Sequence, residues 1–394
     1  MPEVDNIDKA QLAILYTDIG RGHPSYLDGM VETLDQTYPN LRYLKTDVFS
    51  ESSGLSLAAW QLVKKLYYWG ARGGSLTSNY ARLRRGSGAG KEGIMAGILG
   101  RSLRKRFRGF QGPVVVAHPI LAGILSGQNR VIYQHGELAA PSESLVKGCV
   151  KILVPTAGTA AIFTASGIAP EIIEVTGQCV EPDLVAIAED AFNQRIMRLD
   201  GEQPLNVALF SSGAYPREHL QKLRSAAASI CGAGHNVFFF SGASKSVANN
   251  FIRSLQAGNI AVGTSVDDSA QVKVIRAPNR LSENSKVAAI FKSLDLFVAP
   301  AHERTNWAVG LGLPLFILEP HIGSYAPLNA KIALQAGVAQ SIKTDDDARH
   351  LGRTIEQMRR DGRLSSMAGN GYGRTELSGF ARCAEIIAAL SGDK

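Results

Sequence analysis

The sequence predicts an α/β protein of two domains, each with a parallel sheet covered by helices. The first reason is length, because 394 residues exceed the size that one hydrophobic core usually fills. The second is a pattern that occurs once in each half: an apolar strand, a glycine turn and a helix. The third is the alternation of short apolar runs with helical spacing, as expected of parallel strands buried on both faces. We therefore expect two Rossmann-like domains facing a shared cleft.

The repeated glycine turn is expected to face a nucleotide or a phosphate. Its first copy joins the strand Leu12–Thr17 to a helix through Asp18–His23, and its second joins Leu205–Phe210 to a helix through Ser211–Ala214. Glycine lets backbone N–H groups approach a ligand closely, and the helix N-terminus behind the turn favours negative charge. A single copy would be weak evidence, since any α/β domain needs tight turns. Two copies indicate twin domains.

The remaining elements follow in order. Helices are expected near Leu57–Trp69 and Gly93–Phe107, and a last helix from about Glu376 has no strand after it, so we expect that it can cross back to the first domain. The other strands are expected at Leu41–Thr46, Pro113–Ala117, Arg130–Tyr133, Lys151–Val154, Glu171–Val175, Asn236–Phe240, Val272–Ile275, Leu294–Ala299 and Pro314–Leu318. We place an N-terminal domain at 1–180, a partly helical linker at 181–204, a C-terminal domain at 205–372 and the last helix at 373–394.

Composition is that of an ordinary globular protein, with 45% hydrophobic and 20% charged residues. The polar N-terminus does not read as a secretory signal, and no apolar run reaches the roughly 18 residues of a membrane span. The cysteines are scattered, which favours free thiols in a reducing compartment over a metal site or a disulfide frame. They are Cys149, Cys179, Cys231 and Cys383. We expect a cytoplasmic protein.

Basic charge is concentrated in one stretch, residues 56–112. This segment holds twelve lysines and arginines and one acidic residue, Glu92, for a net charge of +11, so the rest of the chain carries −4 of the total of +7. Aromatic residues lie among the cations: Trp60, Tyr67, Tyr68, Trp69, Tyr80, Phe107 and Phe110. Together they predict a surface that docks on an anionic membrane. The alternative is a solvated surface of two helices. No nucleic-acid motif is present, so no nucleic-acid partner is expected.

Histidines at strand ends are the candidate catalytic residues. His23 closes the first glycine turn, where a neutral imidazole could act as a general base. His118, followed by Pro119, and His135, followed by Gly136 and Glu137, come directly after apolar strands, whose carboxyl ends carry the ligand sites of open α/β sheets. A structural role remains the alternative for each of these histidines.

Anion-binding residues are expected in the second half. Arg304, Thr305 and Asn306 follow a buried strand and open a short helix, so backbone N–H groups and a guanidinium could hold a diphosphate there. A solvated turn is the alternative. The full set of donor-binding candidates is Ser212, Gly213, Ala214, Arg276, Arg280, Glu303, Arg304, Thr305, Asn306 and Asn329. The stretch Gly86–Lys91 lacks P-loop spacing and is expected to be a loop.

These motifs together resemble the GT-B glycosyltransferases. The nearest branch holds monogalactosyldiacylglycerol synthase, the processive diacylglycerol glucosyltransferases and, more distantly, the enzyme that makes lipid II. Its GxGH loop is matched by Gly20–His23, its His-Pro strand end by His118-Pro119, and its Val-x-Gly element by Val175–Leu184. The donor half is similar from Asp295 to Ala339.

The chain departs from that family at the donor site and at one strand of the first domain. Where the family has a Gly-Gly pair and then Thr-x-x-Glu, this chain reads His302-Glu303-Arg304-Thr305-Asn306. Where the lipid enzymes carry an aspartate, it reads Gln134-His135. Three functions therefore stay open: a glycosyltransferase, a nucleotide-sugar epimerase, and an inactive protein that binds lipid or nucleotide.

The resemblance implies a metal-independent hexosyltransferase that moves a sugar from a nucleotide diphosphate, expected to be a UDP-sugar, to the hydroxyl of a membrane lipid such as diacylglycerol. We expect no cofactor or metal beyond that co-substrate, and a cytoplasmic protein bound peripherally to membranes. His23, His135 or Glu137 would accept the proton of the acceptor hydroxyl. The acceptor-binding candidates are Gly20, Arg21, Gly22, His118, Trp60, Tyr68 and Trp69.

Overall fold

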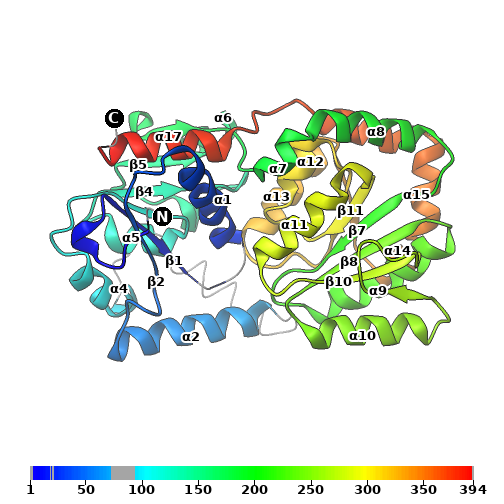
Figure 1. Ribbon diagram of the computed structural model, residues 1–394, viewed down its shortest axis with the longest axis horizontal. Helices are drawn as coiled ribbons and strands as arrows, with labels where there is room; N and C mark the ends of the chain where they lie inside the picture. Colours follow the sequence, from blue (N-terminus) through cyan, green and yellow to red (C-terminus); the bar gives the residue numbers. More distant parts are fainter. Residues whose placement is uncertain (1–2, 18, 20–21, 72–93, 393–394) are drawn as a thin grey trace. The chain divides into compact units, whose positions relative to one another are not determined.

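The computed structural model describes residues 3–17, 19, 22–71 and 94–392. The chain divides into two compact units, each described by itself. The first contains the N-terminal part of the chain up to Val180 and the C-terminal segment from Glu376, and the second runs from Glu181 to Thr375. Figure 1 shows a helix-covered sheet in each unit. The predicted α/β class is confirmed, and every strand expected from the sequence is present with slightly shifted ends.

The first unit is built on a six-stranded parallel sheet in the order β2-β1-β3-β4-β5-β6. Its central strands are largely buried and mostly apolar runs, which explains why they could be predicted from the sequence. The strands are β1 (Leu12–Tyr16), β2 (Tyr43–Asp47), β3 (Val114–Val116), β4 (Val131–Gln134), β5 (Lys151–Val154) and β6 (Ile173–Val175).

Helices cover both faces of this sheet. They are α1 (Gly22–Thr37), α2 (Gly54–Ala71), α4 (Ile94–Arg106), α5 (Pro119–Leu125), α6 (Ala157–Ala165) and α17 (Gly379–Leu390). Helix α17, the last of the chain, returns to the first unit and packs on α1, as expected (Figure 1). The packing is tight, because a Cβ on Gly29 would lie within 2.4 Å of the Phe380 ring.

The second unit has a seven-stranded parallel sheet in the order β13-β12-β11-β7-β8-β10-β9. Its strands are β7 (Asn206–Phe210), β8 (Asn236–Gly242), β9 (Val262–Gly263), β10 (Val272–Arg276), β11 (Leu296–Ala299), β12 (Leu315–Leu318) and β13 (Ala339–Ile342). The two edge strands, β9 and β13, were not predicted from the sequence. The first has only two residues, and the second carries Gln340 and Ser341, so neither shows the apolar run of a central strand.

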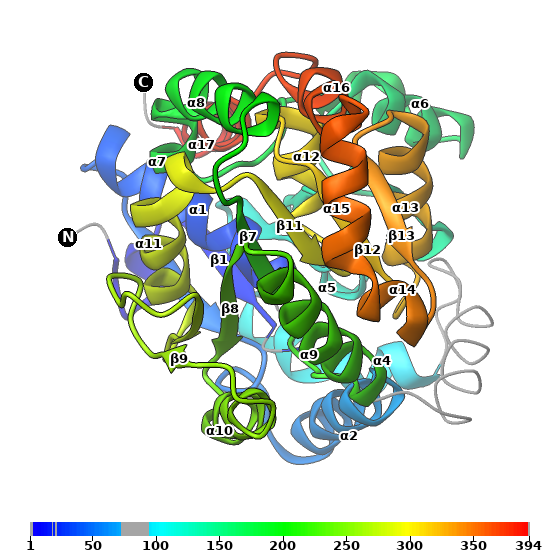
Figure 2. The ribbon, with the colours of Figure 1, turned by 90° about the vertical axis from the view of Figure 1, so that its right-hand side faces the viewer.

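The helices of the second unit are α7 (Pro182–Ala186), α8 (Ala188–Asp200), α9 (Arg217–Gly232), α10 (Lys245–Gln256), α11 (Arg280–Ile290), α12 (Thr305–Leu311), α13 (Tyr325–Gln335), α14 (Asp345–Arg349), α15 (Leu351–Arg360) and α16 (Arg363–Gly371). Figure 2 shows α14 and α15 beside α9 on this unit. Helices α7 and α8 occupy the stretch expected as a linker and belong to the second unit.

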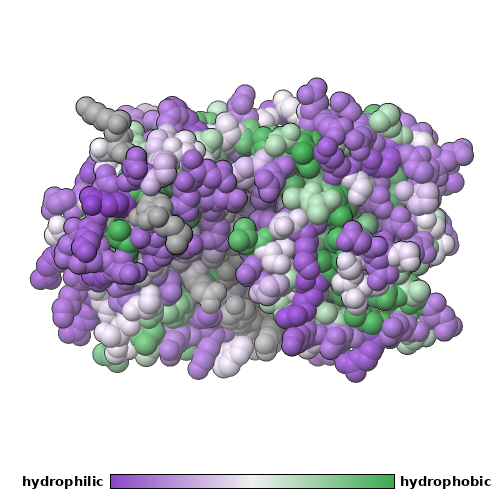
Figure 3. Space-filling view, viewed as in Figure 1, coloured by the Kyte–Doolittle hydropathy of each residue, from purple (hydrophilic) through white to green (hydrophobic). Residues whose placement is uncertain are grey.

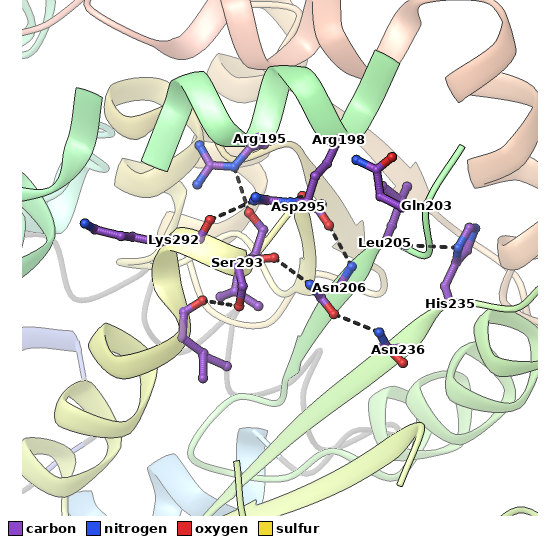
Figure 4. A network of polar contacts seen from close by, with 12 residues as sticks. Arg195, Arg198, Gln203, Leu205, Asn206, His235, Asn236, Lys292, Ser293 and Asp295 are labelled. Carbon is purple, nitrogen blue, oxygen red and sulfur yellow. Dashed lines mark hydrogen bonds and ion pairs between the residues drawn. The ribbon is translucent and has the colours of Figure 1, made fainter. Parts of the chain in front are cut away.

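A buried polar network fixes α8 to the amino ends of β7 and β11 (Figure 4). Arg195, which is fully buried, donates from Nε to the Leu294 carbonyl over 2.9 Å and from Nη1 to the Leu311 carbonyl over 3.0 Å. Arg198 pairs with the buried Asp295 over 2.7 Å, and Asp295 also accepts from the Asn206 backbone N–H over 2.7 Å. The amino ends of these strands are therefore anchored, and their carboxyl ends carry the turns of interest.

Candidate functional site

Three histidines gather at the carboxyl edge of the first sheet. Strands β1, β3 and β4 are neighbours there, and they lead to His23, His118 and His135 respectively. The His23 and His118 rings meet edge to face, with centroids 4.8 Å apart. A charge on His23 would disfavour a charge on His135, so these two rings are also near each other. The structure thus brings together three side chains that the sequence placed at separate strand ends.

His118 is the N-cap of α5. Its Nδ1 accepts a hydrogen bond from the Ile120 backbone N–H over 3.2 Å, and Pro119 occupies the first helical position. Because Nδ1 is an acceptor, the neutral ring carries its proton on Nε2. His118 is buried, and its capping bond fixes the ring that touches His23.

His135 is held inside the first unit. Nε2 donates to the Ala139 carbonyl over 3.0 Å, so Nδ1 is left to accept from the Tyr133 hydroxyl over 3.1 Å. Burial lowers the pKa of His135 to about 3. Both ring nitrogens of His135 are thus engaged by the protein, which leaves the predicted role of His135 as a base without a free ring nitrogen to support it. His23 and Glu137 remain as candidate proton acceptors.

The loop after β4 fixes the start of α1. Gly136 lies so close to Tyr26 that a Cβ there would approach the ring within 2.3 Å. Glu137, the next residue, is buried in the same loop. Because Tyr26 lies one turn beyond His23 in α1, this contact holds the loop against the first turns of that helix.

Two buried histidines predict that the protein loses stability in acid. Burial lowers the pKa of His135 to about 3 and that of His219, which donates from Nε2 to the Pro320 carbonyl, to about 4. Histidine in an unfolded chain titrates near pH 6.5, so below that pH the unfolded state binds protons that the folded state does not. The free energy of unfolding should not be reduced by these histidines above pH 6.5. Below that pH it should fall by up to about 1.4 kcal/mol per pH unit for each histidine as the pH drops toward 4.

Urea unfolding at pH 7, 6 and 5 measures this dependence. A variant with His135→Gln and His219→Gln should show a flatter dependence of stability on pH than the wild type. Equal slopes for the wild type and the double variant would contradict the assignment.

The structure places only some of the acceptor-binding candidates, and not all of them at the surface. Gly22 begins α1, whereas Gly20, Arg21 and the side chain of Tyr68 lie outside the described residues, as does the loop 86–91. Trp60 is a correction: it is fully buried, and its indole N–H donates to the Leu99 carbonyl over 3.1 Å, so it belongs to the core. Trp69 is exposed.

Three buried hydroxyls lie at the carboxyl edge of the second sheet. Ser211 and Ser212 follow β7, and Thr305 begins α12 after the adjacent strand β11. The Oγ atoms of all three are shielded from solvent and have no hydrogen-bond partner within the described parts of the chain. A buried hydroxyl without a partner costs free energy, so such a group calls for an explanation. A ligand that accepts hydrogen bonds would supply one.

Two arginines lie at the same edge, and both are paired with glutamates. Arg280 contacts Glu303 over 3.3 Å and Glu181 over 3.8 Å. Arg304 contacts Glu283 over 2.5 Å and Glu303 over 3.6 Å. Carboxylates therefore already occupy one side of each guanidinium, which the sequence did not predict. The Nε atoms of both are buried without a partner among the described residues.

Glu303 lies between the two arginines. Burial by itself raises the pKa of Glu303, but Arg280 and Arg304 outweigh burial and lower it to about 2. The Arg304 guanidinium also lies over the Phe210 ring, 4.2 Å from its centroid. Glu303 is therefore charged at neutral pH and holds both guanidinium groups in place.

The other donor candidates surround this cluster less closely. Arg276 ends β10, and its Nε donates to the Ala243 carbonyl over 3.4 Å. Asn329 is buried in α13 and donates to the Ala301 carbonyl over 3.3 Å, and Asn306 is buried in α12. Gly213 and Ala214 form the turn after β7, with Ala214 buried against Ile322.

Sequence reasoning missed several residues at this edge. Tyr215 takes a positive φ of 51° and donates from its hydroxyl to the Ser241 carbonyl over 3.0 Å, which holds the glycine turn against β8. His302 and His321 follow β11 and β12, and burial lowers the pKa of each. Their signal was the one used in the first half, a histidine just after an apolar strand. Within the described ranges, no group of three or more His, Cys, Asp or Glu is arranged to hold a metal ion.

Comparison with known proteins gives the fold. No protein-family model matches the sequence, and no curated protein is similar to it in sequence. Among solved structures, the UDP-GlcNAc 2-epimerase of Neisseria meningitidis bound to UDP-GlcNAc has a TM-score of 0.58 at 12% identity, covering 97% of this chain and 100% of that one. MnaA of S. aureus in complex with UDP has a TM-score of 0.56 at 12% identity, covering 100% and 98%.

The UDP-GlcNAc 2-epimerase of Methanocaldococcus jannaschii, in complex with UDP-GlcNAc and UDP, has a TM-score of 0.53 at 13% identity, covering 96% of this chain and 99% of that one. The chain therefore has the GT-B fold, as predicted. At this level of identity the similarity concerns the fold.

Proposed function

We propose that this protein is a nucleotide-sugar enzyme whose second unit binds a UDP-sugar, and that it transfers the sugar to the hydroxyl of a lipid acceptor. The observation that carries the nucleotide site is the set of buried hydroxyls of Ser211, Ser212 and Thr305, which have no partner among the described residues. Proteins that are similar in fold to this chain have been solved with UDP or UDP-GlcNAc bound.

A diphosphate fits the chemistry of this edge. Its oxygens only accept hydrogen bonds, and hydroxyls and guanidinium groups donate them. Ser211, Ser212 and Thr305 would donate, and the Nε–H groups of Arg280 and Arg304 would complete the shell without breaking their pairs with glutamate. Uridine as the base rests on the resemblance of the sequence and on the bound ligands of the structures similar in fold.

In the proposed reaction, His23 accepts the proton of the acceptor hydroxyl. In transfer, the acceptor hydroxyl gives its proton to His23, and the oxygen bonds to the anomeric carbon. The bond from that carbon to the diphosphate oxygen breaks, and UDP leaves with the bonding electrons. The hydroxyls and arginines of the second unit would stabilise the charge on the leaving diphosphate.

A second candidate function is epimerisation at C2 of UDP-GlcNAc. The observation that favours it is the similarity in fold, over almost the whole of each chain, to UDP-GlcNAc 2-epimerases. An epimerase needs no acceptor, so the two functions differ in the products they form and in their need for lipid.

Product analysis distinguishes the two functions. The protein is incubated with a panel of UDP-sugars, with and without diacylglycerol in vesicles, and UDP and the sugars are followed by NMR. Transfer predicts UDP release and a new glycolipid only when lipid is present. Conversion of UDP-GlcNAc to its C2 epimer without lipid would instead establish the epimerase, and no turnover under any condition would leave a binding protein.

A further inference from the structure

Helix α2 presents a stripe of exposed apolar side chains. Leu55 is 72% exposed, Leu62 49%, Leu66 41% and Trp69 56%. The spacings of seven, four and three residues place all four within an arc of roughly 60° at about 100° per residue. In Figure 3, green and pale residues lie among purple ones along the part of the surface where Figure 1 draws α2. This stripe is not part of the first unit's core.

The opposite side of α2 is fixed to the protein. The Trp60 indole and the Ser56 hydroxyl both donate to the Leu99 carbonyl of α4, over 3.1 Å and 2.8 Å. Val63 and Tyr67 pack against the core of the first unit. The helix therefore cannot rotate to bury its stripe, and the four apolar side chains keep facing outward.

Exposed cations lie on α2 itself and on or just after α4. Neither α2 nor α4 contains an aspartate or a glutamate. Some cations of this segment are engaged within the protein: Lys64 lies over the Phe49 ring, Arg104 donates to the Ile124 carbonyl, and Arg106 pairs with Glu51. Among the described residues of the segment, the exposed cations are Lys65, Arg101, Lys105 and Arg108.

This composition selects among possible occupants of the surface. A second copy of the chain, packed through the same face, would bring cations against cations without acidic partners. An anionic bilayer supplies both phosphates for the cations and acyl chains for the apolar stripe. Among the helices of the described residues, none has the length and apolar character to span a membrane.

We propose that α2 lies in the interface of an anionic bilayer, with Leu55, Leu62, Leu66 and Trp69 inserted and the exposed cations Lys65, Arg101, Lys105 and Arg108 on the lipid phosphates. The inference deepens the proposed function, because it names the surface through which the enzyme reaches a lipid acceptor. Only the purpose of the membrane binding rests on the proposed function, because the binding itself is measured without any sugar.

Tryptophan fluorescence reports the insertion directly. The chain has three tryptophans, and Trp60 and Trp307 are 0% and 2% exposed, so a change on adding vesicles comes from Trp69. Vesicles of phosphatidylcholine with phosphatidylglycerol should shift the emission of the full-length protein to shorter wavelength, and rising salt should weaken the shift. Pure phosphatidylcholine should give little change. No shift with anionic vesicles, or an equal shift with neutral ones, would overturn the proposal.

Variants test the stripe itself. Leu55→Ser with Leu62→Ser and Leu66→Ser should lower co-sedimentation with anionic vesicles at least tenfold, because the inserted apolar area is lost. The matched control is Met197→Ser with Leu334→Ser, which replaces residues 65% and 42% exposed on the second unit and should bind as the wild type does. Charge reversal of Lys65, Arg101, Lys105 and Arg108 should also release the protein.

Two results would overturn the assignment. The first is undiminished vesicle binding by the triple variant. The second is a wild-type protein that does not bind vesicles but sediments as a dimer, with the dimer lost in the triple variant. Calorimetric titration with UDP is run on the same variants and should be unaffected. Vesicle binding without UDP binding would therefore contradict the proposed function but support the proposed membrane surface.

Discussion

Replacing Arg304 by methionine should destabilise the second unit by about 3–5 kcal/mol, the usual cost of leaving a buried ion pair without one partner. Arg304 is 8% exposed, pairs with the buried Glu283 and Glu303, and lies over the Phe210 ring. Methionine keeps some of the contact with Phe210 but leaves Glu283 as a buried charge without its cation. Chemical unfolding of the full-length protein measures the loss.

A double-mutant cycle shows whether the pair itself is responsible. Glu283→Gln combined with Arg304→Met should recover a large part of the loss, because the buried carboxylate is then gone. Arg276→Met is the control, since that side chain is exposed at the end of β10 and should change stability by about 0.5 kcal/mol or less. Additive effects of the two substitutions would show that Arg304 and Glu283 do not interact as described.

Replacing His23 by alanine should lower turnover by about 10²–10⁴-fold, the range for loss of a general base. The affinity for UDP should hardly change, because His23 belongs to the first unit and the proposed nucleotide site to the second. Turnover and calorimetric titration with UDP are measured on the same preparation. His350→Ala removes an exposed histidine far along the sequence and should leave both quantities unchanged. Full turnover in His23→Ala would transfer the role to Glu137.

Much of the fold could be predicted because the signals are local. Central strands such as β3 and β11 are short runs of buried aliphatic residues, and helices between them have clear apolar spacing. The edge strand β13 was missed because its exposed position permits polar residues. Trp60 was misassigned for the opposite reason: an aromatic residue among cations suggests an interface, and only the packing of α2 on α4 shows that it is core.

The candidate sites divide in the same way. Histidines after strands are visible in the sequence, and parallel topology then brings three of them to one edge. The glutamates that hold the arginines are not visible, because Glu181 and Arg280 are almost a hundred residues apart and no local pattern links them. The hydroxyls of Ser211 and Thr305 likewise reveal that they have no partner within the described ranges only when every described neighbour is in place.

The central claim is that the hydroxyls of Ser211, Ser212 and Thr305 await a nucleoside diphosphate, and calorimetric titration with UDP tests it most directly. The wild type should bind UDP. The variant Ser211→Ala, Ser212→Ala and Thr305→Val should lose about 100-fold or more in affinity, since each hydrogen bond to a charged group contributes about 1.5–3 kcal/mol. Its free energy of unfolding without ligand should be unchanged or slightly higher, because the hydroxyls removed are ones for which the described part of the chain offers no partner. No binding of UDP by the wild type at millimolar concentration, or equal affinity in the variant, would contradict the account.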